Sequence, residues 1–390
     1  MKITLVTETF PPEINGVAMT LSHLVEGLAH RGHAMTVVRP RQAGPDTPRA
    51  DGLYAENLCP GLPIPGYPFL RLGLPVRRRL LRRWRDDRPD LVHIATEGPL
   101  GYAALSAANR LGLPVSSTFH TNFHHYSRHY GAAFLTRPAL AYLRHFHNRT
   151  RVTLSPTAEL NAELARDGFQ NLRLLSRGVN TRVFTPSVRS TALRESWGAG
   201  PDDLVIVHVS RLAAEKNYSL LIEAYRAVAA ARSGVRLVIA SDGPMRRKLQ
   251  RQIPSAVFTG FLNREDLARC YASGDLFLYP SLTETFGNVV TEAMASGLPV
   301  VAFNYAAAAR YIRHAENGWH VPLGDAAAFV TASVAVAQDA ALRRRLGESA
   351  RATALTIPWD RVIDGFERDL LEIAGRTAAV APAPNPVTAL

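Results

Sequence analysis

The chain has 390 residues, of which 47% are hydrophobic and 8% aromatic, so it is too long for one ordinary core and too apolar for a disordered protein. Its net charge of +12 suggests an anionic partner, but the absence of a basic stretch interleaved with aromatic residues argues against nucleic acid. Two cysteines are too few for a disulfide framework, and neither a signal peptide nor an apolar run of spanning length is recognised, so we expect a cytoplasmic protein.

Short apolar runs alternate with segments of helical periodicity through the first half of the chain. Helices are predicted over 17–29 and 138–148, among others, where apolar residues recur every three or four positions. Strands that are separated by helices form a parallel sheet with both faces covered. In this half, strands are predicted to begin at Ile3, Ala34, Asp90, Pro114 and Arg151.

A strongly basic helix is predicted after Pro75, in the segment PVRRRLLRRWRDDRP. Its apolar residues and its arginines fall on opposite faces at helical spacing. Such a helix can lie on an anionic membrane, with arginines at the headgroups and the tryptophan in the acyl boundary. The alternative is a surface helix whose apolar face lies in the core. The membrane interpretation assigns the contact to Arg77, Arg78, Arg82 and Trp84.

A second series of apolar runs follows a polar stretch over 184–203 that contains several proline and glycine residues, which is typical of a linker. We therefore predict an α/β protein with two doubly wound domains, residues 1–186 and 187–356, that face a central cleft. The tail, residues 375–390, is expected to be disordered. In the second domain, strands are predicted to begin at Leu204, Val235, Ala256, Asp275 and Leu298.

Ligands of such sheets bind at the carboxyl ends of the strands. The first strand leads to Asn15 and Gly16 at a helix start, without the three-glycine fingerprint of dinucleotide binding. Gly16 can let backbone N–H groups approach a phosphate, or it can be a plain turn residue. The sequence has no Asp-x-Asp and no cluster with zinc-ligand spacing, so we expect neither a metal nor a cofactor.

Two cations follow the first strand of the second domain. Arg211 comes directly after the apolar run LVIVHVS, and Lys216 stands five residues later. Because the 45 basic residues include only three lysines, a lysine in this loop indicates a need for a compact point charge. Such cations can neutralise a leaving nucleoside diphosphate without a metal. The alternative is that both are solvated loop residues.

The stretch SLTETFGNVVTEAM places two glutamates eight positions apart around a glycine. Residues 283–286 are predicted to form a loop after a strand, and Gly287 to begin a helix whose N-terminal amides can hold phosphate. Glu284 in the loop can accept hydrogen bonds from sugar hydroxyls. Glu292, away from the apolar face of the helix, can hold the vicinal hydroxyls of a ribose.

Together these motifs resemble the retaining glycosyltransferases of family 4, which have the GT-B fold. The resemblance covers nearly the whole chain, and the ordered Arg, Lys and Glu-x7-Glu elements are its most specific part. It implies two Rossmann-like domains and a helix over 357–374 that crosses back to the first one. The matching segments are FPPEINGVA, TFHTNF, SRGVN, SRLAAEKN, SDGP, VFTGFL, SLTETFGNVVTEAMASGLPVVA and NGWHVP.

The resemblance also implies roles for individual residues. Arg211 and Lys216 would contact the donor diphosphate above Gly16, Glu284 would contact the transferred sugar, and Glu292 the ribose. A histidine of the first domain would lie beside the reacting centre, although a histidine after a strand is more often structural. The implied catalytic residues are His120, Arg211, Lys216 and Glu284, and the implied donor-binding residues are Gly16, Arg211, Lys216, Glu284, Phe286, Gly287, Asn288, Val289 and Glu292.

Within the family, TFHTNF, SRGVN and SRLAAEKN are most similar to enzymes that act on glycerolipid or inositol-lipid acceptors. The resemblance implies transfer of a hexose from a nucleotide sugar, GDP-mannose in first place and a UDP-hexose second, to a membrane glycerolipid or glycolipid. The basic helix agrees with a peripheral position on the cytoplasmic face of the membrane. A soluble or polysaccharide acceptor, a nucleotide-sugar epimerase and a non-catalytic basic binding protein stay as alternatives.

Three segments depart from the family pattern. Ser241 replaces a frequent glycine, which is expected to change only local backbone freedom. The segment TETFG replaces the commoner Glu-Gly-Phe-Gly and leaves both carboxylates in place. NYAAAARYI replaces a glycine-rich loop, so the finer phosphate contacts are open.

Overall fold

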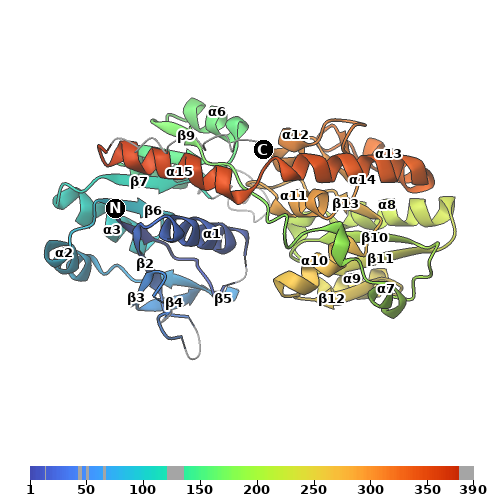
Figure 1. Cartoon of the computed structure of the whole chain (residues 1–390), viewed down its shortest axis with the longest axis horizontal. Coiled ribbons are helices and arrows are strands. Elements are labelled where there is room, and N and C mark those ends of the chain that lie inside the picture. The colour runs from blue at the N-terminus through green and yellow to red at the C-terminus, as the bar shows by residue number, and fades with distance from the viewer. Residues whose placement is uncertain (14, 43–45, 50–51, 65–66, 121–135, 377–390) are drawn as a thin grey trace, which may run out of the picture.

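Two α/β lobes lie side by side in the computed structural model of the chain (Figure 1). The first lobe contains the strands up to residue 174, and the second contains those from residue 204 onward. The predicted disordered tail lies outside the described residues from residue 377 onward. The structure describes residues 1–13, 15–42, 46–49, 52–64, 67–120 and 136–376.

The first lobe is built on a seven-stranded parallel sheet in the order β3-β2-β1-β6-β7-β8-β9. A short antiparallel pair, β4 and β5, is separate from that sheet. The strands are β1 (Lys2–Val6), β2 (Ala34–Pro40), β3 (Ala55–Cys59), β4 (Gly61–Ile64), β5 (Tyr67–Gly73), β6 (Leu91–Ile94), β7 (Val115–Thr118), β8 (Val152–Ser155) and β9 (Leu172–Leu174). The helices are α1 (Gly16–His30), α2 (Arg77–Asp86), α3 (Pro99–Arg110), α5 (Thr136–His147) and α6 (Ala158–Arg166).

The second lobe is built on a six-stranded parallel sheet in the order β12-β11-β10-β13-β14-β15. The strands are β10 (Leu204–Val209), β11 (Val235–Ala240), β12 (Val257–Gly260), β13 (Leu276–Tyr279), β14 (Val300–Phe303) and β15 (Trp319–Val321). The helices are α7 (Thr191–Ser196), α8 (Tyr218–Ala231), α9 (Arg246–Gln252), α10 (Arg264–Ala272), α11 (Asn288–Ala295), α12 (Ala306–Tyr311), α13 (Ala326–Gln338) and α14 (Ala340–Leu355).

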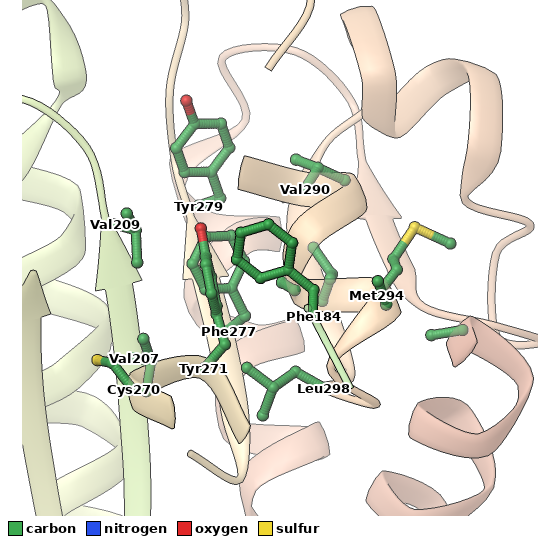
Figure 2. Close-up of a cluster of buried hydrophobic side chains, with 14 of the residues drawn as sticks. Phe184, Val207, Val209, Cys270, Tyr271, Phe277, Tyr279, Val290, Met294 and Leu298 are labelled. Atoms are coloured by element: carbon green, nitrogen blue, oxygen red, sulfur yellow. The ribbon is translucent and has the colours of Figure 1, made fainter. Parts of the chain in front are cut away.

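Hydrophobic residues cover both faces of the second sheet, as a central parallel sheet requires. All six residues of β10 are buried, and successive residues point alternately into two separate clusters. Figure 2 shows one cluster, in which Phe277 of β13 lies among Tyr271 of α10, Met294 of α11 and Phe184 from the segment between the lobes. The core therefore fixes α10 and α11 against the strands that lead to the site.

The helix α15 (Trp359–Ile373) runs from the second lobe back across the first (Figure 1). Its residues Ile363, Phe366 and Leu370 are buried in the core of the first lobe. A Cβ atom at Gly27 of α1 would lie 2.2 Å from Ile363, so a glycine is needed where the two helices meet. The predicted crossing helix is confirmed, as is the two-sheet α/β fold.

All ten strands expected from the apolar runs are present, and the described residues contain five further strands that were missed. Three of those, β3, β9 and β15, lie at edges of the two large sheets, and the other two form the separate pair. An edge strand needs fewer apolar residues because one of its sides is not paired, and β9 and β15 have only three residues each. Apolar runs therefore identified the central strands and, among the edge strands of the two large sheets, β12 but not β3, β9 or β15.

The predicted basic helix is α2, but its tryptophan does not face outward. Trp84 is 2% exposed and packs with Leu80 and Leu81 in the core beneath α3, so the assignment of Trp84 to a membrane contact is wrong. Arg78 and Arg82 are exposed. Among the residues that the structure describes, no helix is long and apolar enough to cross a membrane.

Candidate functional site

Lys216 and Glu284 meet at the carboxyl edge of the second sheet. The loop after β10 carries Lys216, and the loop after the neighbouring strand β13 carries Glu284. The ammonium group lies 2.5 Å from Oε1 of the carboxylate, and the two side chains are 15% and 14% exposed. The same oxygen accepts hydrogen bonds from Tyr279 and, at 2.6 Å, from Ser281. These three donors hold the carboxylate in one orientation.

Arg211 lies on the same loop as Lys216 and forms an ion pair with buried Glu215. The start of this loop is fixed from below by His208, whose Nδ1 lies 2.8 Å from the carbonyl oxygen of Leu278. Burial lowers the pKa of His208 to about 4, so the ring is neutral and Nδ1 carries the proton. Its Nε2 then accepts from the hydroxyl of Ser210 at 2.8 Å. Arg211 and Lys216 therefore follow a strand end whose hydrogen bonds are fixed.

The helix α11 begins immediately after the loop that carries Glu284. Gly287 has a φ of 90°, a left-handed conformation that favours glycine and lets the chain turn into the helix. Phe286 is buried, and Val289 packs at the border of the core. The helix dipole of α11 favours an anion at this end of the helix.

The start of α1 in the first lobe lies close to the start of α11. A Cβ atom at Gly16 would be 3.5 Å from Nδ2 of Asn288, an ordinary van der Waals distance, so the two helix starts are neighbours across the lobes. Asn15 caps α1 by accepting from the amides of Val17 and Ala18, at 3.0 and 2.8 Å. These two amides are therefore engaged within the cap of the helix.

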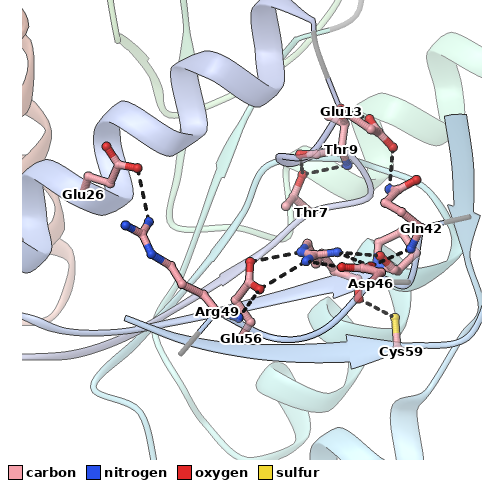
Figure 3. A network of polar contacts seen from close by, with 11 residues as sticks. Thr7, Thr9, Glu13, Glu26, Gln42, Asp46, Arg49, Glu56 and Cys59 are labelled. Atoms are coloured by element: carbon pink, nitrogen blue, oxygen red, sulfur yellow. Dashed lines mark hydrogen bonds and ion pairs between the residues drawn. The ribbon is translucent and has the colours of Figure 1, made fainter. Parts of the chain in front are cut away.

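A polar network holds the loop that leads to Gly16 (Figure 3). The carboxylate of Glu13 accepts from Thr9 at 2.5 Å and from Gln42 at 2.7 Å. Next to it, the buried guanidinium of Arg39 is paired with Asp46 at 2.7 Å and with Glu56 at 3.1 Å. The network joins the loop after β1 to the end of β2, and it thereby fixes the entry to α1.

Glu292 lies on α11, on the side away from the buried Val290, Ala293 and Met294. Its Oε2 accepts from the hydroxyl of Tyr271 at 3.2 Å. Burial raises the pKa of Glu292 to about 7, although this hydrogen bond and the charge of Arg264 act in the opposite direction. The group can therefore change its ionisation near neutral pH.

His120 comes from the first lobe, after β7, and reaches the loop of Glu284. Its backbone oxygen accepts from Thr285 at 3.1 Å, and its Nδ1 accepts from the guanidinium of Arg177 at 2.9 Å. Nε2 is buried and has no hydrogen-bond partner among the described residues. Burial, with the charge of Arg177, holds the pKa of His120 well below its usual range. The ring is therefore neutral, with its proton on Nε2.

Comparison with known proteins identifies the family of the chain. Family models described as Glycosyl transferases group 1 and Glycosyltransferase Family 4 match residues 189–353 and 14–183. A GDP-mannose-dependent alpha-mannosyltransferase of Mycolicibacterium smegmatis is 37% identical over 96% of this chain and 98% of its own. The chain belongs to glycosyltransferase family 4. The predicted family and the enzyme class, a hexosyltransferase, are confirmed.

Two further comparisons bear on the branch and the fold of this glycosyltransferase. An alpha-monoglucosyldiacylglycerol synthase of Acholeplasma laidlawii is 29% identical over 77% of this chain and 80% of its own. The sucrose-phosphate synthase structure from Thermosynechococcus elongatus superposes with a TM-score of 0.78, at 18% identity, over 96% of this chain and 100% of that one. The structural likeness shows that the fold is GT-B.

The structure of the glycosyltransferase brings most of the sequence-predicted residues together. Lys216 contacts Glu284, and Gly287 lies beside Glu284. His120 reaches the same loop through the hydrogen bond that Thr285 donates to its backbone oxygen. Among the described residues, no group of three or more His, Cys, Asp or Glu side chains is placed to hold a metal. The residues predicted to bind the donor lie at two helix starts, in two loops and, for Glu292, in the second turn of α11: Gly16, Arg211, Lys216, Glu284, Phe286, Gly287, Asn288, Val289 and Glu292.

Sequence reasoning missed Arg177, which is 4% exposed. It stands in the segment SRGVN, and the resemblance to the family already included that segment. The available signal was an arginine between two apolar stretches, but only the fold reveals that its partner is a histidine 57 positions earlier. Tyr279 and Ser281 were missed for a similar reason, because a strand end gives no indication of which carboxylate its hydroxyl contacts.

Proposed function

We propose that this glycosyltransferase moves a hexose, with retention of anomeric configuration, from a nucleotide sugar to a hydroxyl of a membrane glycerolipid or glycolipid. GDP-mannose is the donor that we favour, because the relative that is 37% identical is named for it. The diacylglycerol in the name of the Acholeplasma relative supports a lipid acceptor. The exposed arginine face of α2 supports it independently, because anionic membranes attract such a face.

The ion pair of Lys216 and Glu284 beside the start of α11 is the observation that carries the proposal. A nucleotide sugar carries an anionic diphosphate next to a sugar ring with hydroxyl groups. The site has a cation, which matches the diphosphate, next to a carboxylate, which matches the hydroxyls. Lys216, Arg211 and the amides of α11 would hold the diphosphate. Glu284 would accept hydrogen bonds from the transferred sugar, and Glu292 from the ribose.

In the proposed reaction, the bond between the anomeric carbon and the diphosphate oxygen breaks, and the electron pair leaves with the diphosphate. The acceptor hydroxyl forms the new bond on the same face of the sugar, and its proton passes to the departing phosphate oxygen. Lys216 and Arg211 stabilise the charge that develops on that oxygen, the role that a metal has in other sites. His120, neutral with its proton on Nε2, donates a hydrogen bond to a sugar hydroxyl and removes no proton.

The acceptor would approach from the first lobe, with the enzyme on the cytoplasmic face of a membrane. Arg78 and Arg82 are placed on the exposed side of α2 for contact with anionic headgroups, without a contribution from buried Trp84. A surface charge alone gives reversible binding of about 1 kcal/mol for each basic residue near the membrane. Peripheral attachment is therefore expected to weaken with salt.

A panel of nucleotide sugars tests the donor. A donor that binds the folded protein raises its melting temperature, so GDP-mannose is expected to give a larger shift than UDP-hexoses, and the shift is expected to be lost in Glu284→Gln. Turnover with extracted lipids then tests the acceptor. Transfer only to soluble saccharides, or conversion of the donor to an epimer without an acceptor, would contradict the proposal.

A further inference from the structure

A second cavity lies in the first lobe, apart from the donor site. It has a volume of about 540 Å³, and its exposed lining is almost entirely apolar. Cavities of this size hold small molecules or parts of larger ones. Its walls come from the start of α2, the first half of α3 and one residue of α5, and they include Pro75, Pro99, Tyr102, Ala103 and Tyr142. We call this cavity the α3 groove.

Two tyrosines form one wall of the α3 groove although both are on the surface. Tyr102 is 39% exposed and Tyr142 is 40% exposed, and their ring centroids lie 6.2 Å apart. The hydroxyl of Tyr142 donates to the backbone oxygen of Glu97 at 2.5 Å, which directs its ring along the groove. Neighbouring exposed aromatic rings above apolar residues are a typical binding surface for an apolar chain.

The rim of the groove is basic. Arg77, which lines it, donates from Nε to the hydroxyl of Ser106 at 2.8 Å. The same helix, α2, adds exposed arginines, including Arg78 and Arg82. A hydrophobic slot with cations at its rim matches an amphiphile that has an anionic headgroup. A soluble saccharide would leave the apolar lining without a matching surface.

The inner end of the groove lies beside the reacting centre. Glu97 and Gly98, which line that end, follow β6, and β6 pairs with β7 in parallel. His120 stands two residues beyond the end of β7, so both segments emerge at the same edge of the sheet. Glu97 also contacts Nε2 of His147 at 3.0 Å, and the ring of His147 packs on Phe119 next to His120.

We propose that the α3 groove binds one acyl chain of the anionic lipid acceptor, with Arg77 at the headgroup and the acceptor hydroxyl directed toward His120. This inference rests on the proposed function, because it names the part of the acceptor that the first lobe recognises. It also explains why Tyr102 and Tyr142 lie unprotected at the surface.

Photo-crosslinking in vesicles tests the proposal. The probe is a vesicle of equal parts phosphatidylcholine and phosphatidylglycerol, in which the phosphatidylglycerol carries a photoactivatable diazirine in one acyl chain. Mass spectrometry is expected to find the label on peptides that contain Tyr102 and Tyr142. Ser106→Phe, which fills the groove, and Tyr102→Asp, which places a charge in its wall, are each expected to reduce this labelling by about tenfold.

Matched controls keep the result specific. Ala165→Phe and Ala165→Asp add the same groups at an exposed position of α6 in the same lobe, and they are expected to leave the labelling unchanged. Labelling that is spread over the outer face of α2, or that stays equal in Ser106→Phe and Tyr102→Asp, overturns the proposal. The melting temperature without donor is measured on every variant and shows that each is folded.

The two proposals fail separately. If GDP-mannose stabilises the protein but groove variants do not change the labelling, the groove proposal is wrong and the donor proposal stands. If groove labelling depends on Ser106 and Tyr102 but no nucleotide sugar stabilises the protein, the lipid site stands and the proposed transfer reaction is wrong.

Discussion

Arg177 donates a hydrogen bond to Nδ1 of His120 at 2.9 Å, and both side chains are buried. Burial lowers the pKa of Arg177 to about 10, so the guanidinium still carries its charge at neutral pH. That charge disfavours a second proton on the histidine. The pair therefore keeps His120 as a neutral hydrogen-bond donor through Nε2, a role that a protonated or re-tautomerised ring would change.

Replacement of Arg177 by Met is expected to let His120 titrate. The substitution removes the charge of Arg177, whereas burial, which is the largest cause of the low pKa, and the charges of His93 and His147 still act in the same direction. In the variant, kcat at saturating donor is expected to fall at acidic pH, at a value below the ordinary pKa of a histidine, about 6.5, because burial still opposes protonation. The wild type is expected to show no such fall. Arg177→Lys, which keeps the charge, should restore part of the wild-type profile, whereas identical profiles for wild type and Met variant would refute the pairing.

Lys216→Met is expected to destabilise the protein even without donor. It leaves the carboxylate of Glu284 largely buried without its cation, which costs about 3 kcal/mol in the free energy of unfolding. The double variant Lys216→Met with Glu284→Gln should be more stable than Lys216→Met alone. Denaturant unfolding gives the free energy of unfolding of the wild type, the two single variants and the double variant. The exposed Lys248→Met is the control. Strict additivity of the two single changes would show that the contact has no energetic weight.

The same lysine variant tests the catalytic role. Loss of one donor to the departing phosphate is expected to lower kcat by about a hundredfold to a thousandfold. Steady-state kinetics with GDP-mannose and extracted lipid measure this. A rise in the KM for the donor with unchanged kcat would mean that Lys216 contributes only to ground-state binding.

Donor binding is expected to weaken as the pH falls through about 7, the value to which burial raises the pKa of Glu292. The carboxylate form accepts from both hydroxyls of a diol, one with each oxygen, whereas the protonated form carries a proton on one of these oxygens and accepts less well. Glu292→Gln should bind the donor about tenfold more weakly and without this pH dependence. Titration calorimetry across the neutral range measures both, and an unchanged affinity would remove Glu292 from the ribose site.

The raised pKa of Glu292 also predicts how donor-free stability depends on pH. Between pH 4.5, the ordinary pKa of a glutamate, and about 7, the folded protein retains a proton that the unfolded chain has lost. This group therefore makes folding less favourable as the pH rises through that window. Glu292→Gln should have a flatter stability profile there. Identical slopes for the two proteins would contradict the assigned shift.

Ala306→Gly is expected to stabilise the second lobe. Ala306 has a φ of 51°, and a left-handed conformation costs about 1 kcal/mol for a residue with a Cβ atom. Ala308→Gly in the same short helix is the matched control and should destabilise by a similar amount, because its backbone is helical. Ser241, with a φ of 139°, has a related strain at another position that often holds glycine in this family. Equal melting temperatures for the two glycine variants would contradict this account.

The central strands and the loops that carry the cations and carboxylates could be predicted from the sequence because each depends on local residue types. The crossing helix was implied by the resemblance to the family, and the ion pair of Lys216 with Glu284 was not predicted. The apolar runs of β10 and β13 fixed where their loops begin, and Lys216 and Glu284 follow from them. The burial of Trp84 could not be predicted. Helical spacing identifies which face of α2 is apolar, but not whether that face packs on the protein core or on a membrane. Arg177 and the α3 groove depend on contacts between segments far apart in the chain, which no local pattern contains.

Transfer of radiolabelled mannose from GDP-mannose to extracted membrane lipid, compared between the wild type and Glu284→Gln, tests the central claim most directly. The wild type is expected to form an organic-soluble product in which the α configuration of the donor is kept, and the variant is expected to form none. Label recovered as free mannose, as an epimerised donor or as a β-linked lipid would contradict the proposed transfer.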